Sequence, residues 1–169
     1  MPCTVCSEFP CSGSGPCSEP PRQDGLDLLN QDTRERLELW RVGCRHLGLV
    51  VDVIETGRTE ARQAWLYGRG RLDVPYARRG LIVTHVSPRT ADGEPNPKAR
   101  HLLIDGQCAA WDFLITHQRN DAGTIVALPD LWKRGPNAWG VAGSIAVGLG
   151  LVWGGEWSFF DLGHIQGDR

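Results

Sequence analysis

The sequence predicts one small domain of the α+β class, with helices packed on a short, mainly antiparallel sheet. Its 169 residues are 41% hydrophobic and 22% charged, the composition of a globular chain with one substantial core. Apolar side chains recur at helical spacing in two segments, near residues 31–47 and 129–149. Short apolar runs that indicate strands occur at residues 49–54, 81–84, 109–115 and 151–153.

The first 24 residues differ in composition from the rest of the chain. They are rich in Pro, Ser, Gly and Cys, so we expect a flexible tail over residues 1–24 and a folded domain over 25–169. Four of the six cysteines lie in this tail: Cys3, Cys6, Cys11 and Cys17. The first two have the spacing of half a zinc or iron–sulfur site. Because few apolar residues surround them, a tail of reduced thiols is the favoured interpretation.

The first helix and strand of the domain follow from local patterns. Order is expected to begin near Leu26, and the polar run 30–33 offers N-cap side chains for a helix that ends at Gly48. The predicted buried face of this helix consists of Leu37, Leu39, Trp40, Val42, Cys44 and Leu47. Cys44, like Cys108 further on, is expected to be a small buried residue rather than a ligand. A mostly buried strand is predicted next, over residues 49–54.

A second helix is predicted from Thr59, whose side chain can cap it, to the glycines near residues 68–70. Arg58 therefore lies at a strand-to-helix junction, a place from which a side chain commonly points into a cleft. Arg62, one turn further along, is interpreted as a solvated helix residue.

A long loop and a strand with one acid follow. Residues 87–100 are rich in Pro, Gly, Asp and Asn, which predicts a loop that borders a site. The strand over 109–115 carries Asp112 in its middle. A lone carboxylate among apolar neighbours is costly to keep charged unless an arginine or a metal ion meets it.

The closing segment runs from Trp153 to His164 and places Asp161 three residues before the histidine. The helix over 129–149 and the strand over 151–153 lead into it. A carboxylate and an imidazole this close can serve one centre, where one activates water and the other holds a metal ion.

The histidines and acids of the chain combine into one candidate site. Two histidines and a carboxylate, His101, His164 and Asp112, are a ligand set for a catalytic zinc ion that keeps one position for water. Asp161 would then remain free to take a proton from that water and pass it to the leaving amine. Arg58 would stabilise the oxyanion on the attacked carbonyl.

Four blocks of residues carry a family resemblance: Ile54-Glu55-Thr56-Gly57-Arg58-Thr59 with Gln63, Leu66-Tyr67 and Gly70-Arg71; Ile82-Val83-Thr84; His101 to Asp112; and Trp153-Gly154-Gly155-Glu156-Trp157 with Asp161-Leu162-Gly163-His164. Together they cover roughly residues 49–166. In this order they resemble the zinc D-Ala-D-Ala carboxypeptidase and L-alanyl-D-glutamate endopeptidase family, which includes VanX- and VanY-type enzymes and many phage endolysins.

The resemblance implies a fold, a cofactor and roles for individual residues. The fold would be of the hedgehog/D,D-peptidase type and the cofactor zinc, bound by His101, Asp112 and His164. Asp161 would be the general base. Arg58 would contact the substrate and the transition state. The remaining substrate-binding candidates are Gln63, Thr84, Glu156 and Trp153.

The implied activity is hydrolysis of a bond in the stem peptide of bacterial peptidoglycan. By resemblance to the endolysin branch, the expected bond is L-Ala–D-Glu. The alternatives are D-Ala-D-Ala carboxypeptidase or dipeptidase activity and a non-catalytic cell-wall-binding domain with the same fold. Asp161 speaks against the last of these, since a binding module needs no base beside a metal ion.

The third block departs from the family pattern, in which the aspartate follows the histidine by seven residues. Here Asp112 is eleven residues after His101, and Ala99 replaces the usual serine. We interpret the difference as an insertion in the connecting loop. His85 and Asp92 have the seven-residue spacing, but Asp92 falls in a turn-rich loop with no strand to hold a ligand, so His101 and Asp112 are favoured.

A second candidate for the base is Glu156. It follows a Gly-Gly turn, whereas the family assigns the role to the acid three residues before the last histidine. Glu156 is therefore interpreted as a helper that shapes the wall of the site or orients a ligand.

Charge and hydropathy restrict the partners. The formal net charge of −2 gives no electrostatic reason to expect nucleic acid or an anionic membrane as a partner. No apolar run approaches the roughly 18 residues of a membrane span. The N-terminus lacks the basic and apolar regions of a secretory signal. We expect a monomer made in the cytoplasm that acts on the cell wall after release, as a phage or prophage lysin does.

Overall fold

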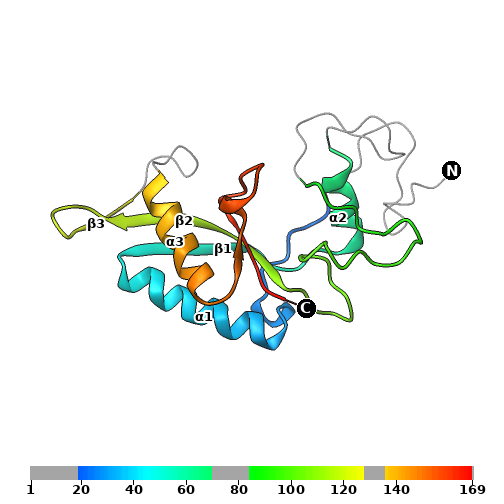
Figure 1. Cartoon of the computed structure of the whole chain (residues 1–169), viewed down its shortest axis with the longest axis horizontal. Helices are drawn as coiled ribbons and strands as arrows, with labels where there is room; N and C mark the ends of the chain where they lie inside the picture. Colours follow the sequence, from blue (N-terminus) through cyan, green and yellow to red (C-terminus); the bar gives the residue numbers. More distant parts are fainter. Residues whose placement is uncertain (1–18, 70–83, 128–135, 169) are drawn as a thin grey trace.

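The computed structural model describes residues 19–69, 84–127 and 136–168. Within these ranges the chain forms helices packed on a small antiparallel sheet, which confirms the predicted α+β class (Figure 1). The elements are η1 (Leu26–Leu28), α1 (Gln31–His46), β1 (Leu49–Glu55), α2 (Glu60–Tyr67), β2 (Ala110–Arg119), β3 (Ile125–Ala127), α3 (Pro136–Gly148), β4 (Val152–Trp153), η2 (Gly154–Glu156) and β5 (His164–Gln166). The strand predicted over 81–84 lies outside the described residues, except for Thr84, which is not in a strand. The first part of the helix predicted over 129–149 also lies outside them.

Strand β2 is the central strand of the sheet. The strand order is β1-β2-β5-β4, with β3 also paired to β2, and every pairing is antiparallel. Strand β1 follows nearly the whole of β2. On its other edge, β2 pairs first with β5 and, at its far end, with β3. The end of β2 that pairs with β5 is the end that carries Asp112.

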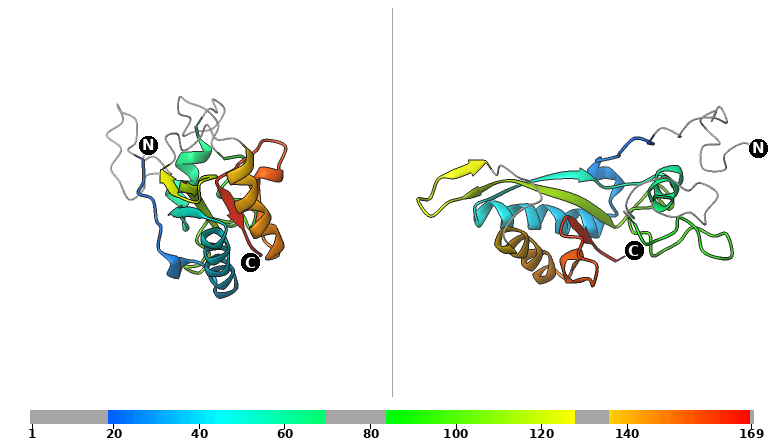
Figure 2. Two further views of the ribbon diagram at one scale, coloured as in Figure 1. Left: turned by 90° about the vertical axis from the view of Figure 1, so that its left-hand side faces the viewer. Right: turned by 90° about the horizontal axis from the view of Figure 1, so that it is seen from above.

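Helices α1 and α3 lie beside each other on one face of the sheet (Figure 2). The core between these layers is aromatic. The Trp40 ring of α1 lies 5.7 Å from that of Trp111 and 4.7 Å from that of Phe113, both on β2. The indole N–H of Trp40 donates a 2.8 Å hydrogen bond to the carbonyl of Ala142 on α3. One buried side chain therefore joins both helices to the central strand.

Helix α1 begins as predicted, but its buried face is narrower. The Asn30 side chain accepts a hydrogen bond from the Thr33 amide and caps the helix. The buried residues are Thr33, Leu37, Trp40 and Cys44. Leu39, Val42 and Leu47 are 58%, 61% and 55% exposed, so their assignment to the core was wrong. Neighbouring positions such as 39 and 40 point in different directions on a helix, and only one stripe meets the sheet.

Helix α2 and strand β1 lie on either side of Arg58, at the edge of the candidate site. The Thr59 hydroxyl accepts a hydrogen bond from the Arg62 amide, which confirms the predicted cap. Strand β1 alternates in exposure instead of being mostly buried, and Val50 is 40% exposed. One face of β1 is therefore open to solvent.

Residues 19–24, which the sequence assigned to the tail, contact the domain without forming a helix or strand. The Thr56 amide donates a 2.7 Å hydrogen bond to the carbonyl of Gln23. The Arg62 guanidinium donates one of 2.6 Å to the carbonyl of Pro20. This part of the chain is therefore attached to the end of β1 and the start of α2 (Figure 1).

Cys44 and Cys108 are buried and not bonded to each other, in agreement with the sequence interpretation. Burial raises the pKa of the Cys44 thiol to about 12, so the group stays protonated at neutral pH. Among the helices that the structure describes, none has the length and hydropathy needed to span a bilayer.

Replacing Trp40 by alanine should lower the free energy of unfolding by about 3–5 kcal/mol, because it removes a fully buried ring and its hydrogen bond. The matched change Leu39→Ala on the exposed side should alter it by no more than about 0.5 kcal/mol. Urea denaturation followed by circular dichroism measures both. Equal effects of the two substitutions would contradict the packing of α1 described above.

Candidate metal centre

The sheet register brings three polar side chains together. Asp112 on β2 lies opposite Glu55 of β1 on one side and opposite His164 of β5 on the other. Residues directly opposite on neighbouring strands point to the same face of a sheet. A row of two carboxylates and an imidazole is therefore a direct consequence of strand pairing.

His101 reaches this row from the loop before β2. Its carbonyl accepts a 2.7 Å hydrogen bond from the Arg58 amide at the end of β1. The chain then makes a tight hairpin, in which Asp105 and Gly106 have φ of 53° and 79°, the conformation of a two-residue turn. After the hairpin, the amide of Ala109 donates a hydrogen bond to the carbonyl of Arg100. This hairpin accounts for the eleven-residue spacing of the two ligands.

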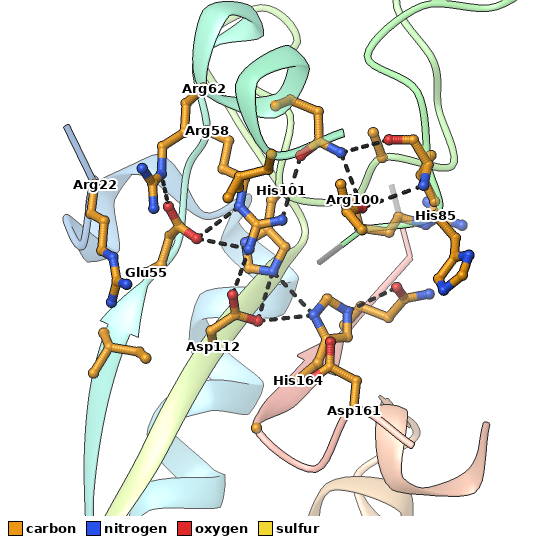
Figure 3. Close-up of a pocket in the computed structure, with 18 of the residues that line it drawn as sticks. Arg22, Glu55, Arg58, Arg62, His85, Arg100, His101, Asp112, Asp161 and His164 are labelled. Atoms are coloured by element: carbon orange, nitrogen blue, oxygen red, sulfur yellow. Dashed lines mark hydrogen bonds and ion pairs between the residues drawn. The ribbon is translucent and has the colours of Figure 1, made fainter. Parts of the chain in front are cut away.

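The three side chains predicted as metal ligands converge. Oδ1 of Asp112 lies 3.0 Å from Nε2 of His101 and 3.0 Å from Nδ1 of His164. The two ring nitrogens are 3.1 Å apart. Both histidines are buried, and Figure 3 shows their rings and the carboxylate facing one point. Among the described residues, this group has ligand atoms close enough to share a metal ion.

The outer hydrogen bonds of the histidines fix where their lone pairs point. Nδ1 of His101 lies 2.7 Å from the carbonyl of Thr56, and Nε2 of His164 lies 3.1 Å from Oε1 of Gln166. A carbonyl oxygen only accepts, so these outer nitrogens carry the hydrogens. The inner nitrogens, Nε2 of His101 and Nδ1 of His164, are then left to face each other and Asp112 with their lone pairs. Three acceptors with no hydrogen between them require a cation, and a metal ion fits this donor set.

The local charges disfavour a proton as that cation. Burial, together with the Arg58 charge, lowers the pKa of His101, so the imidazole stays neutral. Burial alone would raise the pKa of Asp112, but the positive charge of Arg58 holds it well below its usual range. The carboxylate is therefore ionised and the ring unprotonated, which are the forms that bind metal ions.

Arg58 holds the outer oxygen of the aspartate. Its Nη2 lies 2.6 Å from Oδ2 of Asp112 and 2.7 Å from Oε2 of Glu55. Burial alone would lower the pKa of Arg58, but the two carboxylates raise it, so the guanidinium stays charged. The other oxygen of Glu55 accepts from Nε of Arg62. Arg62 is only 2% exposed, so its interpretation as a solvated residue was wrong: it neutralises a buried carboxylate.

A cavity of about 500 Å³ opens on this group. All three ligand residues line it, together with four other residues predicted for the site: Arg58, Gln63, Thr84 and Asp161. Gln63 is 2% exposed and donates a 2.8 Å hydrogen bond to the carbonyl of Val86. Its carbonyl oxygen lies 3.4 Å from Nη1 of Arg58. Gln63 therefore connects the arginine to the loop that follows Thr84.

Asp161 lies next to His164 on the cavity wall, outside the group of three ligands (Figure 3). Its amide donates a 2.9 Å hydrogen bond to the carbonyl of Gly154. A Cβ at position 154 would lie only 2.4 Å from the Asp161 carbonyl oxygen, so this close approach needs glycine. Burial, and then repulsion by Asp112, raises the pKa of the Asp161 carboxyl, which makes it a better proton acceptor.

Two residues predicted to contact a substrate, Trp153 and Glu156, do not line the cavity. The Trp153 indole donates a 2.9 Å hydrogen bond to the carbonyl of Leu162 and packs against Gly143 and Gly155. Its role is to hold the closing segment against α3. Glu156 is exposed on the turn η2 and belongs neither to the cavity lining nor to the group of possible metal ligands. It is not positioned as a second base.

The rival ligand pair is also separated from the centre. His85 and Asp92 are both exposed, and neither belongs to the group of possible metal ligands. The His85 ring instead packs at 4.8 Å against Phe159 on the cavity wall. The structure thus favours His101 and Asp112 over the pair with the family spacing.

Sequence reasoning missed the residues that support the ligands, two of them through side chains and Thr56 through its backbone carbonyl. Glu55, Thr56 and Gln166 do not stand out by type, yet each contacts a ligand or its arginine. Gln166 had a usable signal: it is two residues after His164 on a strand, and side chains two apart share a face. Trp157 also lies at the site, with its ring 5.0 Å from that of His164.

Fold and site together define a small α+β domain with a candidate three-ligand metal centre at the floor of a cavity. A comparison with models of protein families found no match for this chain. A search of curated proteins found no similar sequence.

The purified full-length protein should hold about one divalent first-row metal ion per chain, because three acceptor atoms face one point. His101→Ala and His164→Ala should each lose most of it, whereas His85→Ala should retain it. Gln166→Leu should weaken binding by about 10–100-fold through loss of the outer hydrogen bond. Metal content by atomic emission and competition with a chelator measure these effects. Full metal retention by His164→Ala would refute the assignment of the site.

Proposed function

We propose that the protein is a zinc-dependent peptidoglycan hydrolase that cleaves a bond in the stem peptide, with L-Ala–D-Glu as the expected bond. One observation carries this proposal. Two histidine nitrogens and an oxygen of an ionised aspartate converge on one point on a cavity wall, with a further carboxylate, Asp161, beside them. Such an arrangement is typical of catalytic zinc sites, which use three protein ligands and keep a position open.

The donor set supports zinc. Two imidazole nitrogens and one carboxylate oxygen suit zinc better than calcium or magnesium, which prefer oxygen ligands only. A zinc ion bound there would act as a Lewis acid toward water and the scissile carbonyl. His101, Asp112 and His164 would hold it, and their supporting hydrogen bonds would keep the ligands in the binding orientation.

Asp161 is the residue that we assign as general base. Its carboxyl lines the cavity next to His164 without joining the ligand group. The raised pKa of this carboxyl brings it nearer to the operating pH, which favours transfer of a proton from water and then to the leaving amine. The backbone bond to Gly154 holds it there.

Arg58 has two parts in the proposed mechanism. Its Nη2 is paired with Asp112 and Glu55 and orients the ligand aspartate. Its Nη1 makes only a 3.4 Å contact with Gln63 and borders the cavity. A charged donor in this position can stabilise an oxyanion that develops on the attacked carbonyl.

The choice of substrate rests on the resemblance of the sequence blocks to peptidoglycan peptidases. That resemblance includes Arg58, Gln63, Asp161 and His164, all of which lie on the cavity wall. The D-Ala-D-Ala bond is the rival substrate within the same chemistry. A cell-wall-binding domain without activity would be the rival of another class.

Digestion of purified cell walls with the zinc-loaded protein should release new N-terminal D-Glu, detected by mass spectrometry of the soluble products. Release of free D-Ala or the D-Ala-D-Ala dipeptide would show that the rival bond is cut instead. The metal-free protein serves as the control and should release neither. If the zinc-loaded protein binds the walls and gives no product, the proposed activity is wrong.

The substitution Asp161→Ala should keep the zinc ion but lower the rate of cell-wall hydrolysis by at least about 100-fold, since it removes the proton acceptor. Glu156→Ala is the matched control, because it deletes an exposed acid five residues away that does not line the cavity. Turbidity loss of cell-wall suspensions and metal analysis measure the two effects. An active Asp161→Ala variant beside an inactive Glu156→Ala variant would assign the base to Glu156.

A further inference from the structure

Basic side chains gather on the wall of the cavity. Six cationic and four acidic side chains line it: Arg22, Arg58, Arg62, Arg69, Lys98 and Arg100 against Glu19, Glu55, Asp112 and Asp161. The wall thus has an excess of two positive charges, whereas the whole chain has a net charge of −2. A divalent metal ion at the centre would increase this local excess. The cavity is therefore suited to an anionic ligand.

Most of the acidic groups on the wall are already paired. Arg58 and Arg62 together contact Glu19, Glu55 and Asp112. Asp161 is the remaining acid, and we assign it to proton transfer. Within the described residues, no acidic side chain of the wall is left to pair with Arg22 and Lys98, so a ligand or solvent ions can supply their negative partners.

Arg22 and Lys98 are the cations whose side chains make no hydrogen bond or ion pair within the described residues. Both are exposed and both line the cavity. Arg69, by contrast, stacks over the Trp65 ring at 5.5 Å. Figure 3 shows Arg22 and Arg100 on opposite sides of the metal group, so positive charge borders the centre on two sides.

Both cations lie on segments of the chain that adjoin a metal ligand. Arg22 precedes Gln23, whose carbonyl accepts from the Thr56 amide, and the carbonyl of Thr56 in turn contacts the His101 ring. Lys98 lies three residues before His101, in a turn where its amide donates a 3.0 Å hydrogen bond to the Asn96 side chain. The segments that carry the two cations therefore also support a metal ligand.

We propose that Arg22 and Lys98 select an acidic peptide, with carboxylates on the residues around the cleaved bond, and discriminate against the amidated form. The inference rests on the proposed function for the identity of the ligand as a stem peptide. In such a peptide the D-Glu residue carries a free carboxylate, which becomes neutral when it is amidated to D-isoglutamine. The long arms of arginine and lysine suit recognition of carboxylates that differ in position.

The gathering of the cations on one cavity favours a short acidic peptide over nucleic acid as the anionic ligand. Nucleic-acid binding relies on basic residues spread along a surface that follows many phosphates. Here the cations line the wall of one cavity of about 500 Å³. The remainder of the chain is acidic on balance, with a net charge of −2 overall.

Binding of two synthetic stem peptides, identical except for D-Glu or D-isoglutamine, tests the proposal directly. The protein is the full-length zinc-loaded Asp161→Ala variant, which should not turn the peptides over, and isothermal titration calorimetry gives the affinities. The acidic peptide should bind about tenfold more tightly at low salt. Adding Arg22→Gln or Lys98→Gln should each reduce this ratio of affinities by about three- to fivefold, which is the effect expected for the loss of one exposed ion pair. Higher salt should reduce it as well.

Arg34→Gln is the matched control. Arg34 is exposed on α1 and away from the cavity, so its loss changes the net charge equally but should leave the ratio unchanged. Equal affinities for the two peptides, or a ratio that neither Arg22→Gln nor Lys98→Gln changes, would overturn the proposal. Tighter binding of a short oligonucleotide than of the acidic peptide would also overturn it.

Kinetics with the wild-type enzyme separate this proposal from the proposed function. Cleavage of both peptides at equal kcat/KM would refute the selection by charge and leave the hydrolase assignment intact. Cleavage of neither peptide would count against the hydrolase assignment, and the binding ratio would still decide whether Arg22 and Lys98 recognise the carboxylate.

Discussion

The centre of this structure depends on one electrostatic constraint: three lone-pair atoms of Asp112, His101 and His164 lie 3.0–3.1 Å apart in a buried place. Such a cluster is repulsive without a cation, and the pKa of His101 is lowered so that a proton is disfavoured. The surrounding hydrogen bonds all act to keep the lone pairs turned inward. A bound metal ion would remove this repulsion. Metal binding would therefore also stabilise the fold.

A buried charge network extends from this constraint into the fold. Asp112 must stay ionised, so Arg58 lies against it; Arg58 is shared with Glu55, and Glu55 with Arg62. Breaking a buried pair by removing one partner typically costs about 3–5 kcal/mol, because the remaining charge is left uncompensated. The network also fixes the first residues of the described chain, since Arg62 binds the carbonyl of Pro20. A segment that composition alone assigns to a tail is thus attached to the site.

Whether a feature could be predicted from the sequence depends on whether the interaction that creates it is local or joins distant parts of the chain. The caps at Asn30 and Thr59 are local, so sequence alone was sufficient to predict them. The ligands were predictable by chemical type. Their spacing depends on the hairpin at Asp105 and Gly106, which the sequence analysis treated only as an insertion in a loop, although an Asp-Gly pair is a hairpin signal. The burial of Arg62 depends on a carboxylate on another element, which no helical pattern reveals. The exposure of side chains on α1 likewise depends on which stripe of the helix packs against the sheet.

The placement of Asp161 shows why the closing segment needs its glycines and tryptophans. A base for a metal-activated water must stand beside the ligand group without entering it. Trp153 fills the space at Gly143 and Gly155, where an added Cβ would lie 2.1 Å and 2.2 Å from its ring, and so fixes the turn. The chain then passes through Phe160 at φ 33°, an unfavourable conformation for this residue. Strain of this kind persists only where surrounding contacts impose it, here immediately before Asp161. The hydrogen bond from the Asp161 amide to the Gly154 carbonyl then holds the proposed base on the cavity wall, beside the ligand group and outside it.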